Sequence, residues 1–158
     1  MESHGAIHWR RKAPMTVGAV MAALLLGAAA APPAHFETRL SSVADDLSTR
    51  DDVLGEGRAR ADLVGNQLTV SGEYKGLPSN ATGAELRQGY AIGAPSPAVV
   101  GPLQVSGGRH GTLSGTLKLT KTQLTAMKAG WIYVQIESEK APDGNLWGWL
   151  LPPRSAGQ

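Results

Sequence analysis

The sequence contains no cysteine. This absence excludes disulfide bonds, thiolate metal sites, cysteine nucleophiles, covalent haem attachment and a lipidated cysteine. Aromatic residues are also scarce, at 5% of the chain, and charged residues make up only 18%. The hydrophobic content of 42% nevertheless argues against disorder, which combines low hydrophobicity with high net charge. The length of 158 residues suits one domain, and its site chemistry must use carboxylates, hydroxyls, amines and histidines.

The first thirty residues have the layout of a secretory signal peptide. Three basic residues at 10–12 precede an uncharged run over 13–31, and the run ends in the small residues Ala28, Ala29 and Ala30. We therefore predict a signal peptide at 1–30, a short linker at 31–35, and export to the periplasm or the extracellular space without later membrane attachment. The alternative is an uncleaved membrane anchor, which the marginal length and alanine-rich composition of the run disfavour.

Removing this leader changes the charge of the protein. Twelve of the fifteen basic residues and twelve of the thirteen acidic residues remain, so the mature chain is formally neutral. A nucleic-acid-binding domain would carry a basic surface. We therefore do not expect a nucleic-acid partner.

The mature chain alternates apolar and polar residues with a period of two, between glycine, proline and asparagine turns. This pattern predicts seven or eight short antiparallel strands over residues 36–152, followed by a tail at 153–158. Gly65 and Asn66 form the strongest hairpin signal. The expected fold is all-β, a Greek-key β-sandwich of immunoglobulin-like type.

One short helix interrupts the strands. Thr120 and Gln123 have the spacing of a capping box, and Gly130 is placed to end the helix in a left-handed conformation. We predict a crossover helix between two strands.

Several motifs occur in the order expected for a known family. The matching segments are Gly76–Leu77, Ala84–Gly89, Gly101–Leu103, Leu113–Leu119, Tyr133–Ile136 and Pro142–Leu150. In these segments the chain resembles the CHRD (chordin) domain family, of the type found in secreted bacterial proteins. The resemblance implies a β-sandwich similar to copper/zinc superoxide dismutase and no established general activity.

Three family histidines are replaced in this chain. Glu85, Arg87 and Glu137 stand where the resemblance places histidines that are natural candidates for a metal site. The only mature histidines are His35 and His110, so a three-histidine copper or zinc centre is not expected. We predict no metal and no cofactor, and an ionic cluster of Glu85, Arg87 and Glu137 in place of a metal.

Four aromatic residues form the most suggestive binding feature: Trp131, Tyr133, Trp147 and Trp149. Exposed, they could stack on a sugar or dock a protein, whereas burial, which we favour, would make them part of the core. No complete catalytic constellation is visible, so we do not expect an enzyme. The expected function is a non-catalytic binding or structural module for a protein or glycan partner. The alternatives are a metal-handling or redox accessory protein and a polysaccharide-binding protein.

The leader generates a prediction about processing. Because the basic flank, the apolar run and the Ala-x-Ala end coincide, the exported protein should begin near Ala31. Intact-mass measurement of the exported protein checks this start. A membrane-embedded product that still contains Leu24 to Leu26 would contradict it.

Overall fold

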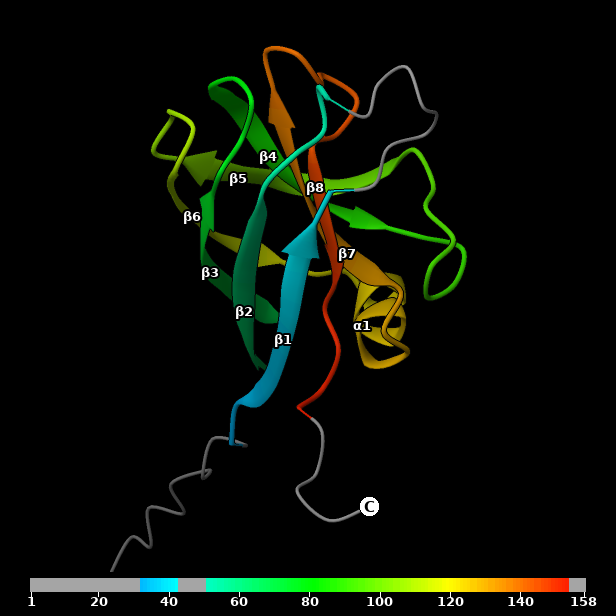
Figure 1. Cartoon of the computed structure of the whole chain (residues 1–158). Helices are drawn as coiled ribbons and strands as arrows, with labels where there is room; N and C mark the ends of the chain where they lie inside the picture. Colours follow the sequence, from blue (N-terminus) through cyan, green and yellow to red (C-terminus); the bar gives the residue numbers. More distant parts are fainter. Residues whose placement is uncertain (1–31, 43–50, 154–158) are drawn as a thin grey trace, which may run out of the picture. The chain divides into compact units, whose positions relative to one another are not determined.

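The computed structural model describes residues 32–42 and 51–153; the predicted leader and most of the predicted tail lie outside the described residues. The described part forms eight strands and one helix (Figure 1). In chain order they are β1 (Ala34–Ser41), β2 (Glu56–Val64), β3 (Gln67–Lys75), β4 (Ala81–Gln88), β5 (Ala98–Val105), β6 (Gly111–Lys118), α1 (Lys121–Lys128), β7 (Ile132–Ser138) and β8 (Leu146–Trp149).

The eight strands form a closed antiparallel barrel, in the order β1-β2-β3-β6-β5-β4-β7-β8. The barrel corrects the predicted open sandwich, because β1 and β8 pair through Ser41 and Trp147 and no sheet edge is left there. A second bridge joins Glu37 to Leu151. The Greek-key connection is present, since β7 returns to lie beside β4 after the β4-β5-β6 meander.

The barrel interior is the hydrophobic core. Inward-facing residues alternate with exposed ones along β2 and β3, so that Ala61 lies opposite Val70 and Leu63 opposite Leu68. The largest wholly buried members include Leu40, Leu68, Leu77, Leu86, Leu113, Met127, Ile132, Ile136, Leu146 and Leu150.

The local sequence signals are confirmed. Gly65, at φ +62°, and Asn66 connect β2 to β3 in a two-residue hairpin. At the start of α1, the backbone N–H of Gln123 donates to Oγ1 of Thr120, and the N–H of Thr120 donates to Oε1 of Gln123. Gly130 follows the helix at φ +74°. The helix crosses from β6 to β7 at the end of the barrel where β1 begins (Figure 1).

Several strand ends differ from the prediction. The first strand begins at Ala34, inside the expected linker, because Ala34 still pairs with Leu63 of β2. Strand β4 begins at Ala81, before the matching segment Ala84–Gly89, because Ala81 pairs with Ser138 of β7. Pairing with a neighbouring strand therefore extends each of these strands beyond the residues that alternate between apolar and polar. Within the described residues, no helix combines the length and apolar character needed to cross a membrane.

Closure of the barrel predicts that Gly148 tolerates no side chain. A Cβ at this position would lie 2.6 Å from Oγ1 of Thr38 and 2.7 Å from the backbone oxygen of Arg39. We expect Gly148→Ala to lower the free energy of unfolding by about 2 kcal/mol, because β8 must move away from β1. Urea denaturation checks this loss.

The control is Gly83→Ala, whose methyl would meet only the flexible carboxylate of Glu137. Equal stability of the two variants would show that β8 does not need the close approach.

Candidate functional site on the outer face of β4, β7 and β8

Strand β7 is buried on both faces. Ile132, Val134 and Ile136 face the core, while Tyr133 and Gln135 point to the outside of the barrel and are also buried, at 0% and 1% exposure. The register places side chains of β4 and β8 on either side of them. We call the resulting group the outer layer; its members are Glu85, Arg87, Tyr133, Gln135, Glu137, Trp147 and Trp149.

The aromatic part of the outer layer is held by stacking. The ring of Tyr133 lies parallel to Trp147 at a centroid distance of 5.6 Å, and it lies against Trp149 at 4.6 Å with a tilt of 46°. Both tryptophans are only partly exposed. Tyr133 is therefore a packing residue, as the preferred burial interpretation expects, and Trp147 and Trp149, two residues apart on β8, share one face.

The loop over residues 89–97 covers this stack. The hydroxyl of Tyr133 donates to the backbone oxygen of Ser96 at 3.0 Å, and the hydroxyl of Ser96 donates to the backbone oxygen of Gln88. Gly89 lies so close to the ring of Trp149 that it has no room for a Cβ. Sequence reasoning did not identify Ser96, because its contact with Tyr133 depends on how this loop folds back.

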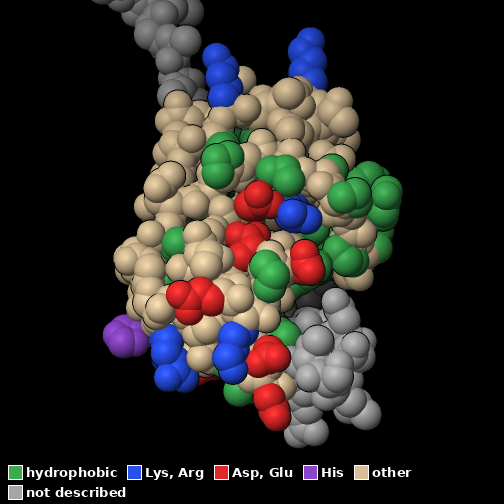
Figure 2. All heavy atoms as spheres, turned by 90° about the horizontal axis from the view of Figure 1, so that it is seen from above, with side chains coloured by type: hydrophobic (Ala, Val, Ile, Leu, Met, Phe, Trp, Pro, Cys, Tyr) green, Lys and Arg blue, Asp and Glu red, His purple; other side chains and the backbone are tan. Residues whose placement is uncertain are grey.

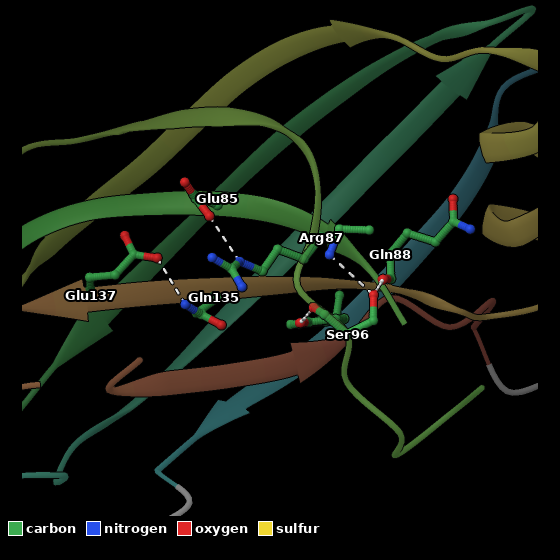
Figure 3. Close-up of polar contacts among 8 residues, drawn as sticks. Glu85, Arg87, Gln88, Ser96, Gln135 and Glu137 are labelled. Atoms are coloured by element: carbon green, nitrogen blue, oxygen red, sulfur yellow. Dashed lines mark hydrogen bonds and ion pairs between the residues drawn. The ribbon is translucent and has the colours of Figure 1, made fainter. Parts of the chain in front are cut away.

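The charged part of the outer layer contains a short ion pair. Nε of Arg87 donates to Oε2 of Glu85 at 2.8 Å, and their side chains are only 24% and 30% exposed (Figure 3). Partial burial lowers the pKa of Arg87, but the hydrogen bond and charge of Glu85, together with Tyr133, outweigh it and raise this pKa. Arg87 is therefore a permanent cation in this layer.

The ionic-cluster hypothesis pairs Glu137 with Arg87, but in the structure Glu137 bonds to another residue. Its Oε1 accepts a hydrogen bond from Nε2 of Gln135 at 3.0 Å (Figure 3). Among the described residues, the ion pairs include none between Glu137 and Arg87. Burial raises the pKa of Glu137, and the charge of Glu85 adds to the rise, while Gln135 and the charge of Arg87 oppose it. The three residues are thus coupled electrostatically, although Arg87 bonds to one carboxylate only.

Two buried polar atoms of the outer layer lack a hydrogen-bond partner in the described structure. They are Oε1 of Gln135 and Nε1 of Trp147, on residues that lie opposite each other in β7 and β8. Gly144 lies directly over Nε1 of Trp147.

Ligands for a metal are not gathered at this site. No group of three or more His, Asp or Glu residues within 32–42 and 51–153 could hold an ion. His35 bonds to Asp62 at 2.5 Å on the outer surface of β1 and β2, and His110 lies just before β6. Copper and zinc, which favour histidine, therefore do not fit the residues present.

Trp131 is separate from the other aromatic residues. It precedes β7, is 39% exposed, and lines a groove of about 320 Å³ along α1 with Lys121 and Thr125. The four predicted aromatic residues therefore do not make one surface: Tyr133 is inaccessible, and Trp131 belongs to another part of the molecule.

The loops at the upper end of Figure 1 carry a mixture of charges. Viewed onto this end, Asp and Glu side chains gather near the centre of the face with Lys and Arg close by (Figure 2). Lys140 pairs with Asp52 at 3.2 Å, and Glu139 accepts hydrogen bonds from the backbone and side chain of Asn80. These carboxylates connect loops of the barrel.

Comparison with known proteins identifies the family. The model of the CHRD domain matches residues 36–150, which is most of the chain and all eight strands apart from the start of β1. The resemblance found in the sequence is confirmed. No curated protein and no solved structure matches the chain significantly.

The raised pKa of Glu137 predicts a pH-dependent effect of Glu137→Gln. A carboxyl whose pKa is raised by folding stabilises the folded state when protonated, and this contribution is lost as pH rises through the folded pKa. At about pH 7 the variant should therefore be at least as stable as the parent, and the advantage should shrink towards about pH 4. Urea denaturation across this range measures the difference.

The matched control is Glu73→Gln, which removes an exposed carboxylate from β3. An advantage of Glu137→Gln that grows on acidification would contradict the proposed cost of ionising Glu137.

Proposed function

The chain belongs to the CHRD domain family, and on this premise we propose that it is an exported, non-catalytic binding module in which the outer layer has a structural role. The observation that carries the proposal is the ion pair of Arg87 with Glu85. This pair occupies two of the three positions at which the resemblance expects histidines, and it joins the face that buries Tyr133. Both residues belong to β4, so the pair fixes two neighbouring side chains of this strand beside Gln135 and Tyr133 of β7.

The chemistry of these residues supports a structural role. A general acid or base needs a carboxylate that can reach a substrate. Here the carboxylate of Glu85 is paired with Arg87, and the carboxylate of Glu137 accepts a hydrogen bond from Gln135. The Tyr133 stack fills the neighbouring space. The guanidinium of Arg87 neutralises a carboxylate of its own strand, and only its charge acts on Glu137 of β7.

A second candidate function is metal handling. It is favoured by one observation: Glu85 lies near enough to Glu137 to raise its pKa, and Glu137 is hydrogen-bonded to the side-chain amide of Gln135. Carboxylate and amide oxygens suit a hard cation such as calcium or manganese. The guanidinium of Arg87 opposes this function, because a cation at the same place would meet its positive charge.

Polysaccharide binding by a flat tryptophan pair is less well supported. The stacking faces of Trp147 and Trp149 are both turned to Tyr133. Only the outer side of each ring is left for a ligand, so any sugar contact must involve further residues nearby.

Removal of Arg87 tests the structural role. We expect Arg87→Ala to lower the free energy of unfolding by about 2 kcal/mol, because Glu85 loses its partner in a partly desolvated place beside Glu137. The double variant Glu85→Ala with Arg87→Ala should lose less than the sum of the single losses. Denaturation of the four proteins of this cycle measures the coupling.

Thermal melts with a chelator, and with added copper, zinc, manganese or calcium, distinguish the two candidate functions. The structural role predicts melts that none of these additions changes. A melt lowered by chelator and restored by one metal, together with an unaffected Arg87→Ala variant, would establish metal handling instead.

A further inference from the structure

Three arginines come together on the outer face of β1 and β2. Arg39 of β1 lies directly opposite Arg58 of β2, and Arg60 is two residues further along the same face. All three side chains are exposed. The register of the barrel, rather than proximity in sequence, therefore creates a local concentration of guanidinium groups.

Folding does not require this concentration. Like charges directly opposite each other on neighbouring strands are destabilising. Arg39 does reach Glu56 at 3.0 Å, but Glu56 is shared with Lys75 at 3.2 Å, and the hydrogen bond and charge of Lys75, with the charge of Arg39, lower the pKa of that carboxyl.

Arg58 and Arg60 lack even one such ion pair within the described residues. Glu73 lies opposite Arg58 and Glu37 opposite Arg60, yet neither arginine forms an ion pair with any carboxylate of the described residues. Within the part of the chain that the structure describes, both side chains are exposed and accessible to an anion.

A groove of about 420 Å³ runs beneath these arginines. Arg39, Arg58 and Arg60 line one side of it, and Trp149, Leu151 and Pro152 line the other. It follows the seam where β1 and β8 meet. A second groove, of about 680 Å³, also includes Arg39 and Arg58 and continues across β3 past Tyr74 and Thr112. The two arginines therefore stand between two grooves that share one wall.

We propose that this surface binds an acidic polysaccharide, an inference that rests on the proposed binding function and names its ligand class. Carboxylate or sulfate groups of the sugar chain pair with the planar guanidinium groups of Arg58 and Arg60, while one sugar ring lies against the outer side of Trp149. Arginines two residues apart on a strand are separated by about 7 Å, which suits a ligand with repeated charges along its length.

Other polyanions fit this surface less well. A nucleic acid requires a broad basic surface, but carboxylates of Glu37 and Glu56 lie among the arginines and the mature chain is formally neutral. An acidic protein partner would bind best to a surface with a larger apolar centre than Trp149, Leu151 and Pro152 provide.

The test compares two double variants of the full-length chain by calorimetry and affinity electrophoresis. Polygalacturonate is the acidic probe, and dextran, inorganic sulfate and a DNA duplex are the comparison probes. We expect the parent to bind polygalacturonate, more weakly at about 300 mM than at about 50 mM salt, and not to bind dextran. Arg58→Gln with Arg60→Gln should weaken binding about tenfold or more.

The matched control is Lys118→Gln with Lys128→Gln, which removes the same charge from β6 and α1, outside the groove. It should bind like the parent. Thermal melts check folding, and the arginine variant should melt no lower than the parent, because the like-charge pair of Arg39 with Arg58 is removed.

Four results would overturn the inference. Equal loss in both double variants would indicate general charge attraction, equal affinity for sulfate alone would indicate a small-anion site, and tighter binding to DNA would indicate a nucleic-acid surface. Failure of the parent to bind polygalacturonate would also reject the ligand class. The structural role of the outer layer is judged separately, by the Arg87 cycle and the metal melts.

Discussion

The burial of β7 on both faces is the constraint on which the rest of the outer surface depends. A barrel strand normally needs cover only on its inner side, but here Tyr133 and Gln135 are buried on the outside as well. Buried polar groups must be hydrogen-bonded, so the Tyr133 hydroxyl requires the Ser96 carbonyl and the Gln135 amide requires Glu137. The position of the 89–97 loop and the partial burial of Glu137 both follow from this requirement.

One cation near two carboxylates explains the electrostatics of the outer layer. Arg87 forms its short contact with Glu85, at 2.8 Å, and acts on Glu137 only through its charge. Burial and the charge of Glu85 together outweigh that attraction, so the pKa of Glu137 rises. The layer therefore retains a carboxylate that is costly to ionise, while the neighbouring ion pair is fully formed.

Local features of this molecule were predictable, and long-range ones were not. The Gly65–Asn66 hairpin and the Thr120–Gln123 capping box are encoded within a few residues, and the period of two correctly indicated antiparallel strands. Closure of the barrel depends on β1 meeting β8 at the other end of the domain, so the pattern alone suggested a sandwich. The Gln135–Glu137 bond was missed because long side chains two residues apart must both turn along the strand to meet.

The two outer faces of the barrel are connected through β8. Trp149 packs against Tyr133 and is confined by Gly89, and it also lines the groove beneath the three arginines. A ring held in this way loses little conformational entropy when a ligand contacts it, which lowers the cost of binding. Gly148, beside it, keeps β8 close to β1 and so fixes the width of the seam. The buried layer on β7 thus supports an aromatic side chain that is held in place, opposite exposed arginines on long side chains. A fixed apolar surface beside several cations suits an anion with repeated charges better than a single small one.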